Sequence, residues 1–118
     1  MSVLDQIRKK QLIESPETIN ADWNSPSTSL DDRAGAFSLA LKYENGVGPV
    51  SMIVTLQLSV DDINFADVTD SEITITDTEG VAIYDVDGSG TSYARLKVTV
   101  TSGSIDAVEL KYVASQFH

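Results

Sequence analysis

Apolar and polar residues alternate along most of the chain from about residue 18 onward, which is the spacing of β-strands that bury one face. In the run 37–43 the apolar positions are Phe37, Leu39, Leu41 and Tyr43. Further runs occupy residues 51–58, 65–68, 73–76, 81–86, 93–101 and 106–114. Turn-forming residues separate the runs. The pattern predicts an all-β fold, an antiparallel β-sandwich of about seven to eight strands.

Two glycine-containing segments are predicted to be turns. Residues 44–49 separate the run 37–43 from the run 51–58, so these neighbours are expected to pair as an antiparallel hairpin. Residues 102–104 are expected to connect the strand 93–101 to a separate last strand that begins near residue 106. The alternation in residues 93–101 is the cleanest of the chain, with Ala94, Leu96 and Val98 on the face predicted to be buried.

The N-terminal residues follow a different spacing. Val3, Leu4, Ile7 and Leu12 recur at roughly helical intervals before Ser15-Pro16 ends any helix. We therefore predict a short helix or arm over residues 1–17, followed by the β-sandwich domain over residues 18–118. A segment this short needs a surface to pack on, which is either a neighbouring subunit or its own domain. These four residues, with the single tryptophan Trp23, are the candidate partner-binding residues, and both interpretations stay open.

The length and charge of the chain narrow its possible partners. At 118 residues it fits one domain, and its formal net charge is −10. The clustered positive charge lies in Arg8, Lys9 and Lys10. An acidic surface repels phosphate backbones and anionic lipids, so we expect neither nucleic acid nor a membrane as partner. No segment has the length of a membrane span or the pattern of an export signal.

Few residues suit catalysis or cofactor binding. The chain has no cysteine, and its only histidine is the last residue, His118. Asp61, Asp62, Asp67, Asp70 and Glu72 are close in sequence, but they occur in predicted turns, where aspartate favours hydrogen bonds to its own backbone. No glycine-rich phosphate loop is present. We expect no enzymatic activity and no cofactor.

One segment partly matches a calcium-binding loop. Asp85, Asp87 and Ser89 place oxygen ligands at alternate positions, as the first half of such a loop does. The twelfth position is Leu96, so the closing carboxylate is missing. A β-turn is the favoured interpretation, and no metal is predicted.

Cationic and aromatic side chains offer an alternative function. Tyr93, Arg95 and Lys97 share one face of a strand, which predicts either a binding stripe or a solvated face. The aromatic residues that could stack on sugars are Trp23, Tyr43, Tyr84 and Tyr93. A carbohydrate-binding or adhesion β-sandwich module is therefore the alternative to a structural protein, and it requires solvent-facing aromatic rings.

Residues 54–65, with the sequence Val-Thr-Leu-Gln-Leu-Ser-Val-Asp-Asp-Ile-Asn-Phe, resemble a segment of small structural proteins of tailed bacteriophages. Their β-sandwich domains carry a V-T-L-Q-x-S-x-D strand and turn, followed by an aromatic residue. The later Tyr93-Ala94-Arg95 strand and the Ser-Gly turn at 101–104 extend the resemblance to about residues 28–114. The chain departs from the pattern at Asp62, where glycine is common, and at Phe65, where tryptophan is common.

The resemblance implies a non-enzymatic virion component, made in the host cytoplasm, such as a capsid decoration protein or a head/tail accessory subunit. Such a protein binds a symmetric surface of other virion proteins, the major capsid protein or connector and tail proteins. It also implies a homo-oligomer, whose assembly can be confined to the virion.

Overall fold

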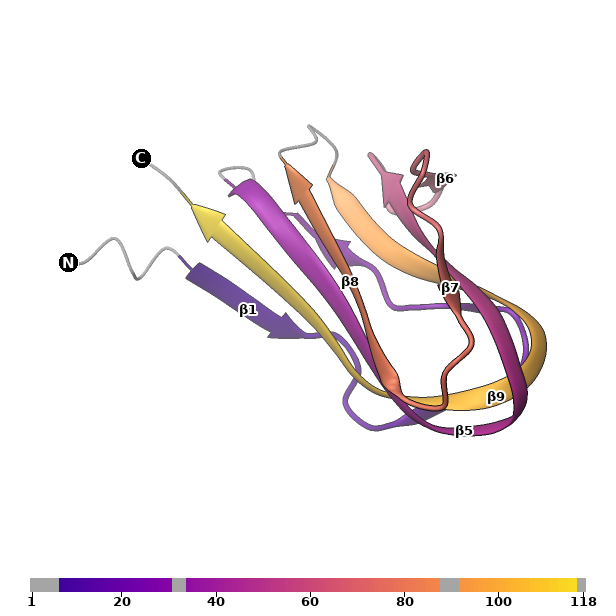
Figure 1. Ribbon diagram of the computed structural model, residues 1–118. Coiled ribbons are helices and arrows are strands. Elements are labelled where there is room, and N and C mark those ends of the chain that lie inside the picture. The colour runs from indigo at the N-terminus through magenta and orange to yellow at the C-terminus, as the bar shows by residue number, and fades with distance from the viewer. Residues whose placement is uncertain (1–6, 31–33, 88–91, 117–118) are drawn as a thin grey trace.

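The computed structural model describes residues 7–30, 34–87 and 92–116, which form one antiparallel sheet of nine strands (Figure 1). The strands are β1 (Ile7–Gln11), β2 (Glu17–Ile19), β3 (Trp23–Asn24), β4 (Thr28–Ser29), β5 (Ala34–Ser59), β6 (Ala66–Asp67), β7 (Ile73–Ile75), β8 (Gly80–Asp87) and β9 (Tyr93–Gln116). No helix occurs in these ranges, so nothing in them could cross a membrane as a helix.

The sheet is folded over on itself, because its two longest strands bend together. β5 and β9 pair antiparallel along almost their whole lengths, from Ala34↔Gln116 to Ser59↔Tyr93. Both ribbons curve around the lower right of Figure 1 and return upward. The bend produces two packed layers from one continuous sheet, and the predicted all-β antiparallel sandwich is confirmed.

Shorter strands complete each layer at its edges. The first half-sheet contains residues 34–44 of β5 and 105–116 of β9, with β1 and β2 beside β9 and β8 beside β5. The second half-sheet contains residues 50–59 of β5 and 93–101 of β9, with β3 and β4 beside β9 and β6 and β7 beside β5. Every pairing is antiparallel.

The bend lies at the two segments that were predicted to be turns. Asn45 and Gly48 have φ of 57° and 75°, Gly103 has φ of 77°, and the register between β5 and β9 shifts repeatedly between Glu44 and Met52. Such irregularities bend a ladder while leaving it paired. A side chain at Gly103 would place its Cβ 2.8 Å from the Pro49 carbonyl oxygen, so the close approach of the two strands requires glycine here.

The predicted hairpin between residues 37–43 and 51–58 is therefore wrong. The two runs are consecutive parts of β5, and each pairs with β9 instead of with the other. The same correction applies to residues 93–101 and 106–114, which are parts of one strand. Glycine and asparagine supply positive φ both in a reversing turn and in a bulge that only bends a strand, so composition does not separate the two cases.

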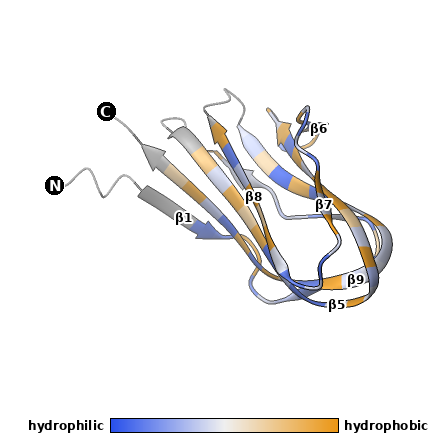
Figure 2. Ribbon diagram, in the orientation of Figure 1, coloured by the Kyte–Doolittle hydropathy of each residue, from blue (hydrophilic) through white to orange (hydrophobic). Residues whose placement is uncertain are grey.

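The alternation in the sequence places the core between the half-sheets. Figure 2 shows hydrophobic and hydrophilic bands alternating along β8 and β9. Inward-facing residues of β5 and β9 lie opposite one another, as in the pairs Leu39↔Tyr112 and Leu56↔Leu96. The largest fully buried side chains are Tyr112, Ile19, Leu39, Leu41, Met52, Leu56, Ile75, Leu96, Ile105, Leu110, Val54 and Val98.

A hydrogen bond also joins the two layers across the core. The Tyr84 hydroxyl on β8 donates to the Val54 carbonyl oxygen on the second half of β5, at 2.7 Å. Burial raises the pKa of the Tyr84 hydroxyl well above its ordinary value, and the nearby Glu72 carboxylate acts in the same direction. The neutral, donating form of Tyr84 is therefore favoured in the folded protein.

The N-terminal segment is a strand where it is described. Residues 7–11 form β1 and pair with residues 111–115 of β9, so the helix, one of the two predicted alternatives of helix or arm, is wrong for these residues. A short helix has little stability of its own, whereas β1 gains a full ladder of hydrogen bonds with β9. Ile13, just after β1, is buried in the core. Residues 1–6 lie outside the described residues.

Candidate interaction surfaces

Of the predicted partner-binding residues, the structure describes the side chains of Leu12 and Trp23. Leu12 and Trp23 are half-buried and pack against the core, which fits the interpretation that the N-terminal segment covers its own domain. Ile7 begins β1, in the outermost position of the first half-sheet. Val3 and Leu4 lie outside the described residues, so docking through them stays a prediction.

The partial calcium motif lies in a strand. Asp85 is in β8, and its carboxylate accepts a hydrogen bond from the Ser38 hydroxyl on β5. Asp87 is the last residue of β8, and Ser89 lies outside the described residues. Among the described side chains, no three His, Asp or Glu residues form a group that could hold a metal ion.

Within the cationic stripe, the Arg95 side chain is engaged by contacts inside the protein. The Arg95 guanidinium lies 4.0 Å from the centre of the Phe65 ring, and its Nε donates to Gln57 Oε1 at 2.8 Å. The Gln57 Nε2 in turn donates to Asp67 Oδ1 at 2.7 Å. This network fastens the segment after β5 onto the outer face of the second half-sheet, so Arg95 has a structural role.

The aromatic residues considered for sugar stacking do not form an exposed row. Tyr43 and Tyr84 are buried in the core, and Trp23 packs against it. Tyr93, at the start of β9, is half-buried. A glycan-binding platform needs open ring faces, and these four residues do not offer one together.

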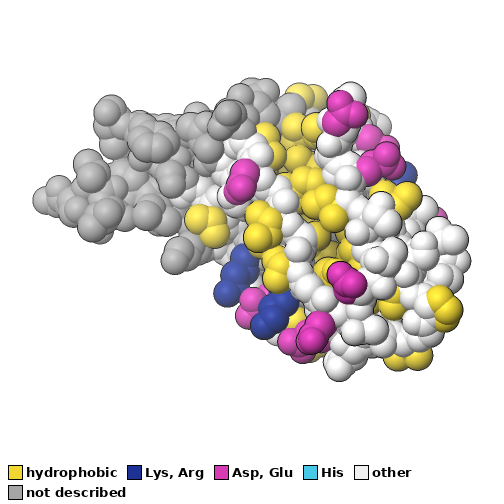
Figure 3. Space-filling model, in the orientation of Figure 1, with side chains coloured by type: hydrophobic (Ala, Val, Ile, Leu, Met, Phe, Trp, Pro, Cys, Tyr) yellow, Lys and Arg dark blue, Asp and Glu magenta, His cyan; other side chains and the backbone are white. Residues whose placement is uncertain are grey.

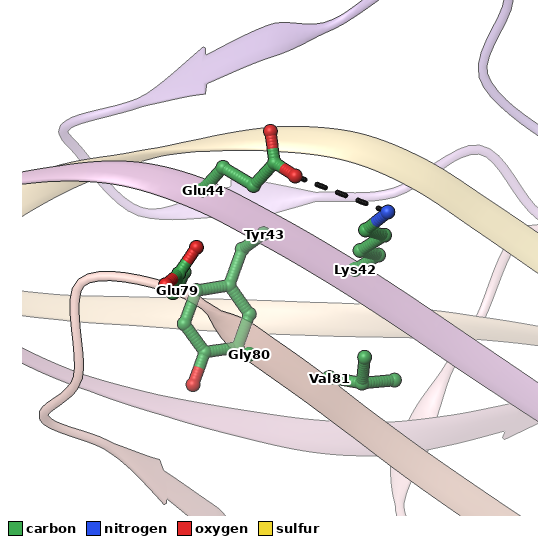
Figure 4. Close-up of a pocket in the computed structure, with 6 residues that line it drawn as sticks. All are labelled: Lys42, Tyr43, Glu44, Glu79, Gly80 and Val81. Carbon is green, nitrogen blue, oxygen red and sulfur yellow. Dashed lines mark ion pairs between the residues drawn. The ribbon is translucent and has the colours of Figure 1, made fainter.

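A small hollow lies beside the start of β8. It has a volume of about 180 Å³ and is lined by Lys42, Tyr43, Glu44, Glu79, Gly80 and Val81 (Figure 4). Lys42 and Glu44 form an exposed ion pair of 3.9 Å on one side of it. The hollow is smaller than the range of roughly 300–1,000 Å³ usual for small-molecule sites. We assign it no ligand.

The segment after β5 forms a well-ordered loop that sequence reasoning treated only as a turn. Asp61 organises it: its Oδ1 accepts hydrogen bonds from the backbone N–H groups of Ile63 and Asn64, each at 2.9 Å. Its Oδ2 accepts from Asn64 Nδ2 at 2.9 Å, and the Ser59 hydroxyl donates to Oδ1 at 2.9 Å. These bonds hold the pKa of the Asp61 carboxyl far below its usual range.

Further hydrogen bonds hold the same loop from within and from a neighbouring segment. Within it, the Ser59 hydroxyl accepts hydrogen bonds from the backbone N–H groups of Asp61 and Asp62. From the segment before β4, the Ser27 hydroxyl donates to Asp62 Oδ1. Asp62 has a φ of 62°, a conformation that aspartate tolerates better than most residues. Ser59 to Asn64 will be called the Asp61 loop. The carboxylates of Asp61 and Asp62 therefore shape a loop.

The Asp61 loop presents two aliphatic side chains to solvent. Val60 is 71% exposed and Ile63 is 79% exposed. The segment lies at the open end of the folded sheet, opposite the bend, where β5 ends and β9 begins. A rigid loop that exposes two large aliphatic residues is a candidate contact surface.

A second apolar surface lies on β8. Val81 is 52% exposed and Ile83 is 55% exposed, both on the outer face of the first half-sheet. Figure 3 shows hydrophobic side chains gathered in a band along the described part of the face that carries β7 and β8, with acidic side chains on both sides of the band. In the sequence, Val81 and Ile83 alternate with Ala82 and Tyr84, which are buried in the structure. Alternation alone does not show that β8 is an edge strand.

No protein-family model matches the sequence, and no curated protein matches it at a significant level. Solved structures with a similar fold do exist. The VP2 subviral particle of infectious bursal disease virus and the Gt strain of the same virus each align with a TM-score of 0.60, at 10% and 11% identity. The alignments cover 93% of this chain and 32% of the viral chain, so the chain spans about a third of the length of the proteins it matches. At this identity the likeness shows a shared β-sandwich fold.

A carbohydrate-binding module in complex with β-1,4-galactotriose aligns with 12% identity over 92% of this chain and 84% of that chain, at a TM-score of 0.40. An alignment this weak adds nothing to the alternative function.

Proposed function

We propose that this chain is a non-enzymatic structural protein of a tailed-bacteriophage virion, a capsid decoration or head/tail accessory subunit that binds a symmetric surface of other virion proteins. The sequence resemblance over residues 54–65 supports the bacteriophage assignment. The fold similarity to the proteins of infectious bursal disease virus also supports the proposal, because it shows that a β-sandwich of this kind occurs in a virus particle.

The observation that carries the proposal is the Asp61 loop. It coincides with the segment that resembles the bacteriophage proteins, and it exposes Val60 and Ile63 on a backbone held by hydrogen bonds to Asp61 and Ser59. Full burial of a large aliphatic side chain contributes roughly 1.5–3 kcal/mol. Because the loop is already ordered in the free protein, the entropy cost of ordering it on binding offsets little of this favourable free energy.

Symmetry strengthens a contact of this size. Two aliphatic side chains form a small interface, and one copy alone would bind weakly. When several linked copies meet equivalent sites on a symmetric surface, each later contact is intramolecular and the combined affinity rises by orders of magnitude. A compact acidic domain with a small, rigid apolar contact is therefore suited to repeated binding on a particle.

The test is the composition of purified virus particles from the organism that encodes the chain. We expect mass spectrometry to find the chain in a fixed ratio to the major capsid protein, and immunogold electron microscopy to place it at regular positions. The double variant Val60→Ser/Ile63→Ser should be lost from the particles with an unchanged melting temperature. Val47→Ser, which removes an aliphatic residue at the bend that is 65% exposed, is the control and should be retained.

Absence of the wild-type chain from washed particles would overturn the proposal. Retention of the Val60→Ser/Ile63→Ser variant would overturn the role of the Asp61 loop.

A further inference from the structure

The bend of β5 contains an asparagine followed directly by a glycine, Asn45-Gly46. An asparagine in this position can lose its side-chain amide without an enzyme. The Gly46 backbone nitrogen gives up its proton and attacks the Asn45 Cγ, a new C–N bond closes a succinimide ring, and the side-chain nitrogen leaves with a proton as ammonia. Water then opens the ring and leaves a carboxylate, as aspartate or as isoaspartate.

The sequence and the exposure of Asn45 favour this reaction. Glycine has no Cβ to shield its backbone nitrogen, whereas the other three asparagines of the chain precede alanine, serine and phenylalanine. Asn45 is exposed, so water and hydroxide reach it. It also has a φ of 57°, in a segment where the pairing of β5 with β9 is irregular.

The folded protein holds the attacking nitrogen in a hydrogen bond. The Gly46 N–H donates to the Thr78 carbonyl oxygen at 2.9 Å, in the connection between β7 and β8. A Cβ at Gly46 would lie 2.6 Å from the Thr78 Cα, so this connection packs directly against the glycine. The nitrogen must leave this hydrogen bond before it can lose its proton and turn toward the Asn45 side chain.

The folded protein also holds the group that would be attacked. Asn45 Nδ2 donates to Asp106 Oδ2 on β9 at 3.1 Å. The other oxygen of the same carboxylate accepts the Thr18 hydroxyl of β2 at 2.8 Å, which fixes the acceptor in turn. Both reacting groups of the Asn45-Gly46 pair are therefore engaged elsewhere while the bend is closed, and the reaction requires a local opening.

Deamidation would replace a favourable contact by an unfavourable one. A carboxylate at position 45 cannot donate to Asp106, and it would place a second negative charge where the amide now lies 3.1 Å from that oxygen. The isoaspartate product also lengthens the main chain by one methylene group, at a point where Gly46 already lies close against Thr78. Both products should therefore disfavour the closed bend.

We propose that Asn45 is a deamidation site that the folded bend protects, and that deamidation there weakens the bend irreversibly. The inference goes beyond the proposed function and does not depend on it. The modification should be confined to chains whose bend has opened. Because its product favours further opening, a modified chain should not regain the original stability.

Peptide mapping by mass spectrometry tests the protection. The wild type is incubated at mildly alkaline pH, once folded and once unfolded in guanidinium chloride. Two hydrogen bonds have to open in the folded chain, so we expect deamidation at Asn45 to be at least about tenfold slower there. Asn24 and Asn64, which do not precede glycine, are internal references and should react little in either sample.

Two variants test whether the hydrogen bond to Asp106 contributes to this protection. Asp106→Ala frees the Asn45 amide and should raise the rate of deamidation in the folded protein, while the rate in guanidinium chloride stays that of the wild type. Thr18→Val removes only the bond from β2 to the same carboxylate, so it is the control and should react more slowly than Asp106→Ala. Circular dichroism confirms that both variants are folded.

The stability of encoded products tests the second half of the proposal. Asn45→Asp should lower the melting temperature by several degrees at neutral pH, because two carboxylates face each other. Asn45→Asp/Asp106→Asn exchanges the two groups, and the amide at position 106 can donate to the new carboxylate. The double variant should therefore recover most of the loss, and the single Asp106→Asn completes the cycle.

Three results would overturn the proposal. An unfolded chain that does not deamidate at Asn45 would remove the site. Equal rates in the folded and unfolded chains would remove the protection by the bend. An Asn45→Asp variant as stable as the wild type would remove the effect of the modification on the fold.

Discussion

The closed and open ends of the folded sheet are built on different principles. At the bend, the close approach of two main chains determines the structure, because Gly103 lies so near the Pro49 and Val47 carbonyl oxygens that no side chain fits. At the open end, side chains are decisive, because Asp61 and Ser59 hold a loop by hydrogen bonds while Val60 and Ile63 remain free of the core. Changes at the bend should therefore affect stability, and changes at the open end should affect binding.

The largest stability effect is expected from Gly103→Ala. The alanine would have to adopt a φ of 77°, which costs about 1–2 kcal/mol. Its Cβ would also lie 2.8 Å from the Pro49 carbonyl oxygen and 2.9 Å from that of Val47, and such overpacking adds typically about 1–3 kcal/mol. We expect urea denaturation to show a loss of about 3 kcal/mol in the free energy of unfolding.

Gly48→Ala is the matched control for this change. Gly48 has nearly the same φ, 75°, but the nearest atom to its added Cβ would be 3.9 Å away. Only the conformational cost of about 1–2 kcal/mol remains. Equal losses in the two variants would show that steric contact between β5 and β9 does not set the geometry of the bend.

A smaller effect is expected from Tyr84→Phe, which removes the hydrogen bond joining the layers and keeps the ring in the core. Loss of the 2.7 Å bond to the Val54 carbonyl oxygen should lower the free energy of unfolding by about 1–2 kcal/mol. Guanidinium denaturation at neutral pH measures this loss. A variant as stable as the wild type would mean that packing alone holds the half-sheets together.

The same tyrosine predicts a pH dependence. The pKa of Tyr84 is raised in the folded state above its unfolded value of about 10, so its contribution to stability is present below pH 10 and is lost as the pH rises beyond it. The wild type should lose stability above pH 10 more steeply than Tyr84→Phe. Part of the slope should remain in the variant, because burial and Asp77 also raise the pKa of Tyr43.

The sequence predicts the layers of this fold better than its connections. Alternation at Phe37, Leu39 and Leu41 identifies the buried face correctly, because a strand that covers a core must place every second side chain inward. The path of the strand at Asn45 and Gly48 was not predictable, since a reversing turn and a bulged bend require the same conformations from the same residues. Whether β5 pairs with itself or with β9 depends on contacts far apart in the sequence.

The candidate surfaces were also predictable from the sequence only in part. Asp61 in a Ser-Val-Asp-Asp sequence predicts a turn, because aspartate accepts local backbone hydrogen bonds, and the Asp61 loop confirms it. The spacing of Ile7 and Leu12 indicates a helix, but the segment forms a strand because it pairs with the edge of β9. That edge exists only in the folded sheet, so the sequence pattern does not show it. The same limit applies to Val81 and Ile83, because alternation places them on one face of a strand and only the folded sheet shows that this face is exposed.

The smallest effect on global stability, and the most local one, is expected at Asp61. Hydrogen bonds from Ile63, Asn64 and Ser59 lower the pKa of its carboxyl in the folded state, so its contribution to stability is present above the unfolded value of about 4 and is lost as the pH falls below it. Asp61→Ala should leave the thermal midpoint at neutral pH nearly unchanged and should accelerate amide hydrogen exchange at Ile63 and Asn64.

Asp61→Asn separates charge from shape at the same position, because its side-chain oxygen can still accept the two backbone N–H groups. It should keep slower exchange than Asp61→Ala and should lose the part of the acid dependence that Asp61 contributes. If Asp61→Ala binds particles as well as the wild type, the order of the loop is irrelevant to recognition, and only the exposed side chains count. If binding is lost while the fold persists, the open end works as a preorganised contact, in contrast to the bend, whose geometry serves the fold alone.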